Sequence, residues 1–182
     1  MRPCIYIIVM TFNRKIKIAL SAAFTLAVMI TIFIFSSQNG SQSSGASNGV
    51  GMWVLGLLGI EIPPGQSPSD VVIFAGLKIR NFAHIFLYFC MGLSSYLLSA
   101  SLWSIKVQAR PSRTLFSALC AFGFSLFYAC TDEFHQYFIP GRSATVRDIG
   151  IDCIGIALAV LICVVVELII YAVCTRRTAQ TD

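Results

Sequence analysis

Four long apolar runs dominate the sequence and lie at about residues 18–35, 82–105, 114–131 and 149–173. A helix that crosses a bilayer needs about 20 predominantly apolar residues, and each run is close to that length. The chain is 57% hydrophobic and only 12% charged, unlike an ordinary soluble domain. The pattern therefore predicts an all-α, polytopic membrane protein with four transmembrane helices.

The segment between the first two runs, residues 36–81, is long and mixed in character. Its Ser- and Gln-rich start, residues 36–45, is typical of a flexible polar connection. Residues 50–60 are apolar but too short to cross, which predicts an interfacial or re-entrant helix ending before residues 63–65. Ser69 and Asp70 then resemble a helix N-terminus leading towards the second run.

Basic residues set the predicted topology. Nine of the thirteen lie on one side of the four runs: Arg2, Arg14, Lys15, Lys17, Lys106, Arg110, Arg113, Arg176 and Arg177. The positive-inside rule makes that side cytoplasmic. Residues 1–17, 106–113 and 174–182 are then inside the cell, and residues 36–81 and 132–148 outside. We expect a multi-pass protein of the bacterial cytoplasmic membrane with both termini cytoplasmic.

Other classes fit the sequence less well. A cleaved signal peptide normally has an apolar core of about 7–15 residues, and the first run is longer, which favours an uncleaved anchor. The basic residues flank apolar runs instead of forming one patch, which argues against nucleic-acid binding. The seven cysteines contain no CxxC pair and are interpreted as small buried hydrophobes, with a Cys130–Cys153 bridge left open. Residues 1–12 form a further short apolar segment.

Polar side chains follow helical spacing at the start of the second run. Arg80, His84 and Tyr88 are four residues apart, so they share one helix face, each about 6 Å from the next along the axis. Alone, Arg80 is typical of an interfacial anchor, and His84 of a satisfied packing residue. Their shared face indicates a polar stripe that descends into the membrane.

The end of the third run carries a matching stripe. Asp132 and Gln136 share one face with Tyr128, and Glu133 lies on an adjacent face. Residues 139–142 (IPGR) fit a type II turn, with Pro second and Gly third, where φ must be positive. The chain thus turns back at once towards the fourth run.

The fourth run opens on residues 145–148, which resemble a capping box with Asp148 in place of the more usual Glu or Gln. Asp152 follows four residues later on the same face. Gly155 and Ala159 come next, and small residues there allow another helix to approach closely.

These helix ends predict one cluster of charged residues at the outer leaflet. We expect Arg80 and Arg142 to pair with carboxylates of the cluster, because unpaired charge at membrane depth is costly. Its candidate acid–base residues are His84, Asp132 and Glu133, and its candidate ligand-binding residues are Arg80, Tyr88, Gln136, Arg142, Asp148 and Asp152. The alternative is a salt-bridge network that only locks the helices together.

The same residues carry a family resemblance. The block from Asp132 and Glu133 through Gln136 to residues 138–142, followed by Asp148, Asp152 and Gly155, resembles the signature of the VanZ-like family of bacterial membrane proteins. Arg80, His84 and Tyr88 match the family's earlier span, and residues 35–38 (FSSQ) its start. The likeness covers about residues 18–173. Asn81 stands where the family usually has a basic residue, and Asp152 where it usually has Asn.

The resemblance implies an envelope protein, since the founding member lowers susceptibility to teicoplanin, a lipoglycopeptide that binds peptidoglycan precursors. The two departures remove one positive charge and add one negative charge, which argues against a site that binds only anions. The family's molecular activity is not settled, so the resemblance supplies no mechanism.

Three functions remain open. The first is binding or modification of an outer-leaflet amphiphile: a lipid-linked precursor, a phospholipid or a lipoglycopeptide, gripped by Arg80 and Arg142. The second is an enzyme that uses His84 with Asp132 or Glu133 for acid–base chemistry. The third is a structural or partner-binding membrane protein. The sequence shows no zinc-type spacing and no nucleophile elbow, and we expect no metal or cofactor.

Overall fold

The computed structural model describes residues 14–60, 67–103 and 110–179 of the chain. Within these ranges it is helical without strands. Its elements are α2 (Arg14–Ser36), α3 (Gly40–Leu57), α4 (Pro68–Trp103), α5 (Arg110–Gln136) and α6 (Val146–Ala179). The short apolar segment at residues 1–12 and the predicted turn at residues 63–65 lie outside the described residues.

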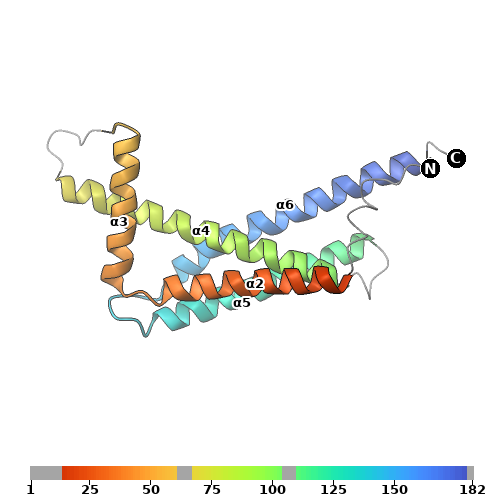
Figure 1. Cartoon of the computed structure of the whole chain (residues 1–182), viewed down its shortest axis with the longest axis horizontal. Helices are drawn as coiled ribbons and strands as arrows, with labels where there is room; N and C mark the ends of the chain where they lie inside the picture. Colours follow the sequence, from red (N-terminus) through yellow and green to blue (C-terminus); the bar gives the residue numbers. More distant parts are fainter. Residues whose placement is uncertain (1–13, 61–66, 104–109, 180–182) are drawn as a thin grey trace.

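Helices α2, α4, α5 and α6 are each long and apolar enough to cross a membrane, which confirms the predicted all-α fold with four spans. They run along one long axis in Figure 1. The start of α2 and the end of α6 lie at the same end of this bundle, and α3 crosses it at the other end. We call the end that α3 crosses the α3 end. A helix across the bundle axis has the orientation of an interfacial helix.

The connection between the first two spans is more ordered than predicted. Helix α3 begins at Gly40 and takes in the Ser-rich segment that was expected to be flexible. The reason is an N-terminal capping box: the Asn39 side chain accepts from the Gln42 N–H, and the Gln42 side chain accepts from the Asn39 N–H.

Helix α4 begins at Pro68, next to the N-terminus predicted at Ser69 and Asp70, and Pro is well suited to a first helical position. With 36 residues it is about 54 Å long, well beyond the hydrocarbon thickness of a bilayer. Its first turns therefore extend past the bundle and pack against α3 (Figure 1). Asp70 lies in the first turn, as expected.

Helices α4 and α6 cross closely because Gly155 has no side chain. A Cβ at Gly155 would meet the carbonyl oxygen of Ile85 and, at 2.9 Å, the backbone nitrogen of Phe89. Ala159 is fully buried against the same helix, beside Gly92. The close approach predicted from these small residues is confirmed, and it brings the His84 face of α4 against the Asp152 face of α6.

The turn after α5 docks on the start of α3. Gly141 has φ +74°, and the Arg142 N–H donates to the Ile139 carbonyl at 3.1 Å, which confirms the predicted turn. The Gly40 N–H donates to the Pro140 carbonyl at 3.0 Å. A Cβ at Gly40 would collide with Gly141, so the two segments touch through backbone alone. This contact holds Arg142 beside the ends of α2 and α3.

Candidate functional site

A buried hydrogen-bond network joins the end of α2 to the last turns of α5. The Ser36 hydroxyl donates to Asp132 Oδ2 at 2.9 Å, and Gln136 Nε2 donates to the same oxygen at 2.9 Å. Gln136 Nε2 also lies 3.2 Å from Ser36 Oγ. All three side chains are buried. The Asp132 carboxyl group is therefore held by neutral donors inside the protein.

Arg142 reaches this network through Gln136. Its guanidinium donates to Gln136 Oε1 at 2.9 Å, to the Gln38 carbonyl at 2.9 Å and to the Phe35 carbonyl at 3.0 Å. The prediction that Arg142 pairs directly with a carboxylate is therefore wrong. The turn places it beside the exposed carbonyls that end α2, and these neutral acceptors take its donors.

The surroundings of Arg142 disfavour its charge. Burial, followed by the nearby guanidinium of Arg80, lowers the pKa of Arg142 from its ordinary value. Asp132, Glu133 and Asp148 offset part of this effect from a distance. An anion placed between the two arginines would be stabilised by both.

His84 pairs with Asp152 across the α4–α6 crossing. His84 Nδ1 lies 3.1 Å from Asp152 Oδ1, and the Asp152 side chain is completely buried. The expected carboxylate partners of His84 were Asp132 and Glu133, so that part of the prediction is wrong. Gly155 is the reason, because it lets α6 approach α4 closely enough for Asp152 to bond to His84.

Two further polar atoms beside this pair are buried without a well-formed hydrogen bond. Asp152 Oδ2 is buried and unpartnered, and the Tyr88 hydroxyl is buried without a well-formed hydrogen bond. Tyr88 lies within electrostatic range of both Asp132 and Asp152. Buried polar groups normally have hydrogen-bond partners, so Asp152 Oδ2 and the Tyr88 hydroxyl can each form a further hydrogen bond.

Glu133 caps the start of α6. Its Oε2 accepts from the Thr145 N–H at 2.9 Å, and the Thr145 hydroxyl accepts from the Asp148 N–H at 3.2 Å. Half of the predicted capping box is thus present, and Glu133 from α5 supplies the acceptor expected from Asp148. The half-buried Asp148 lies within electrostatic range of Glu133 and Asp152.

A cavity of about 350 Å³ opens beside this cluster, between α2, α3, α4 and the turn. Four residues of the predicted site line this cavity: Arg80, His84, Tyr88 and Arg142. Its apolar lining includes Ile32, Phe35, Val50, Ile79, Phe86 and Leu87. Arg80 is half-buried and makes no hydrogen bond or ion pair within the described part of the chain, so its predicted pairing is also wrong.

The structure thus separates the predicted site into two parts. Four of its residues line the cavity. Gln136 and Asp152 bond to Arg142 and His84 from outside the lining, and Asp132 bonds to Gln136. Glu133 and Asp148 lie at the start of α6. Within residues 14–60, 67–103 and 110–179, no group of three or more His, Cys, Asp or Glu side chains is arranged to hold a metal ion. Cys130 and Cys153 are both free thiols, so the bridge left open by the sequence is not formed.

Sequence reasoning missed a second polar cluster, at the opposite end of the bundle. Glu167 accepts from the Tyr96 hydroxyl and from Arg113 Nη2, both at 2.6 Å, and so links α6 to α4 and α5. A single acid inside the apolar run of α6 was the available signal. Ser36 was likewise missed, although it ends the first apolar run.

Four apolar spans, and a buried polar cluster where their ends meet, define a polytopic helical membrane protein. A model of the VanZ/LLP1 family matches residues 21–169, which is most of the chain. The protein therefore belongs to the VanZ/LLP1 family, as its motifs indicated. No curated protein and no solved structure matches it.

Proposed function

We propose that this protein binds an anionic amphiphile in the cavity at the α3 end. The observation that carries the proposal is the juxtaposition, in one cavity, of Arg80 and Arg142 with an apolar wall. A guanidinium matches phosphate and carboxylate groups by paired hydrogen bonds. The wall formed by residues such as Phe35, Phe86 and Leu87 suits a hydrocarbon chain.

The charge distribution supports an anionic head group. Asp152, the acid that departs from the family pattern, is buried against His84 and is not part of the cavity lining. Its carboxyl group therefore lies behind His84 and outside the space between the arginines. Arg80 has no hydrogen-bond or ion-pair partner among residues 14–60, 67–103 and 110–179, which leaves its donors available to a ligand.

The proposed setting is the outer leaflet of the bacterial cytoplasmic membrane, with both termini inside the cell. The basic residues that flank the opposite end of the bundle support this orientation. The ligand is then a phospholipid, a lipid-linked cell-wall precursor or a lipoglycopeptide. Each combines an ionisable head with an apolar tail. Because the family's founding member lowers susceptibility to teicoplanin, the proposal includes a protective role against teicoplanin-type antibiotics.

A second candidate function is acid–base catalysis on the bound amphiphile. The His84–Asp152 pair favours it, because a buried carboxylate that holds one imidazole nitrogen orients the ring and supports a proton on it. His84 also lines the cavity. Recovery of a chemically altered lipid or antibiotic from expressing cells would favour this reading over simple binding.

The test measures teicoplanin susceptibility of expressing cells together with membrane abundance and melting temperature of each variant. We expect Asp132→Asn and Arg142→Ala to abolish protection while the protein still accumulates. Arg147→Ala, a change at an exposed position just before Asp148, is the matched control and should retain protection.

Two outcomes count against the site. Full protection by both variants would dispose of it. Loss of protection that only follows loss of abundance would favour the third reading, a structural or partner-binding protein whose charged cluster braces the helices.

A further inference from the structure

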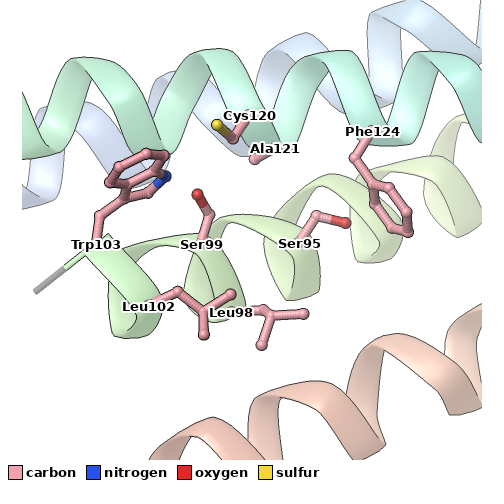
Figure 2. Close-up of a pocket in the computed structure, with 8 residues that line it drawn as sticks. All are labelled: Ser95, Leu98, Ser99, Leu102, Trp103, Cys120, Ala121 and Phe124. Carbon is pink, nitrogen blue, oxygen red and sulfur yellow. The ribbon is translucent and has the colours of Figure 1, made fainter. Parts of the chain in front are cut away.

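Helices α4 and α5 enclose a second cavity, of about 480 Å³, at the end of the bundle opposite α3. Figure 2 shows Trp103 at one end of it and Phe124 at the other, with Ser99 between them. Leu98, Leu102 and Ala121 complete most of its apolar lining. The volume is in the range of about 300–1,000 Å³ that is usual for small-ligand sites.

This cavity opens towards the surroundings of the bundle. Leu102 and Phe124 are 45% and 44% exposed, and Cys120 is also exposed. All of these residues belong to apolar spans, so the surroundings are membrane hydrocarbon. Its entrance is therefore accessible to a lipid and not to bulk water.

One polar atom in the cavity lacks a partner. The Ser99 side chain is only 7% exposed, and its hydroxyl makes no hydrogen bond. Ser94 and Ser101 on the same helix donate back to the carbonyls of Met91 and Leu97. Ser99 makes no such bond to its own helix, and its hydroxyl points towards α5 beneath Ala121 and Cys120 (Figure 2).

The depth of Ser99 matches one part of a phospholipid. Trp103 ends α4 and stacks on Phe116 with ring centroids 5.5 Å apart, and Trp residues favour the head-group level of a bilayer. Ser99 is one turn deeper, about 6 Å along the helix. That is where the ester carbonyls of a glycerophospholipid meet the hydrocarbon. Phe124 lies further in (Figure 2).

We propose that the cavity holds one acyl chain of a glycerophospholipid, with the chain's ester carbonyl accepting a hydrogen bond from Ser99. Ser99 is about 22 Å along α4 from His84, so this lipid belongs to the opposite leaflet from the first cavity. The inference rests on its own residues and is independent of the proposed function.

The test uses the full-length protein in dodecyl maltoside micelles and a phosphatidylglycerol probe with a diazirine on one acyl chain. After illumination, labelled peptides are identified by mass spectrometry. We expect label on residues 95–103 and 117–124. Unlabelled diester phosphatidylglycerol should compete about two- to tenfold better than its diether analogue, because the ether lacks the carbonyl that Ser99 recognises.

Ser99→Ala should erase the preference for the ester while the protein stays folded. Cys120→Trp should fill the cavity and remove the label, whereas Cys130→Trp, at another exposed cysteine of α5, should leave it. Arg80→Ala, in the first cavity, should also leave it. Equal competition by the ester and ether lipids against wild type, or label unchanged by Cys120→Trp, would overturn the proposal.

Discussion

Single side chains in this protein are satisfied by partners that differ from those the sequence suggests. Spacing along a helix predicts which residues share a face, as Arg80, His84 and Tyr88 do where they line the cavity, because helix periodicity is a local property. The pairing of His84 with Asp152 depends on how α4 and α6 cross, which spacing does not contain. Arg142 was predicted to find a carboxylate, but the backbone carbonyls at the end of α2 lie nearer.

Glu167 provides a test at the same scale. Glu167→Gln keeps the shape of the side chain but removes the charge that balances Arg113, and both side chains are largely buried. Loss of one member of a buried ion pair costs about 3–5 kcal/mol. We expect a clear fall in melting temperature in detergent.

Tyr96→Phe is the control for Glu167→Gln. It removes one hydrogen bond to the same carboxylate and should cost about 1 kcal/mol. A Glu167→Gln protein with the same melting temperature as wild type would show that the ion pair contributes nothing to stability.

At the scale of elements, the four spans were predictable because each is a long apolar run. Helix α3 was only half predicted, since its first turns are polar and depend on a capping box that a Ser- and Gly-rich composition conceals. The start of α4 was predictable because Ser69 and Asp70 mark a helix N-terminus well before the apolar run. Its first turns lie outside the span and are ordered by packing against α3.

Gly155 tests the element that assembles the site. Gly155→Leu should separate α4 from α6, because even a Cβ there collides with the backbone of α4. Overpacking typically costs about 1–3 kcal/mol, and a backbone clash belongs at the upper end. The measurement is melting temperature and membrane abundance.

Gly150→Leu is the matched control for Gly155→Leu. It makes the same change on the same helix, at a position with open space around it. Equal melting temperatures for the two variants would contradict the close α4–α6 contact.

At the scale of the whole molecule, the structure places the start of α2 and the end of α6 at the same end of the bundle (Figure 1). Which side of the membrane that end faces is a prediction from charge: we expect it in the cytoplasm. Gly45→Cys and Ser143→Cys should then react with an impermeant thiol reagent in intact cells, in a background without reactive native cysteines. Labelling only after permeabilisation would reverse the orientation.

Arg80 offers the most direct test of the central claim, that the cavity at the α3 end is a ligand site. It lines the cavity but bonds to no other described residue, so it makes no contact that would hold the helices together. The measurement is phosphatidylglycerol binding to purified Arg80→Ala in mixed micelles, beside its melting temperature, with every protein compared in the Cys120→Trp background so that the second cavity is filled. Lys78→Ala, at an exposed position on the same helix, is the control.

We predict an unchanged melting temperature for Arg80→Ala. Its phosphatidylglycerol binding should be weakened about tenfold or more, because one charge-assisted hydrogen bond is lost. Lys78→Ala should bind as wild type does. Binding by Arg80→Ala equal to that of wild type and Lys78→Ala would contradict the account.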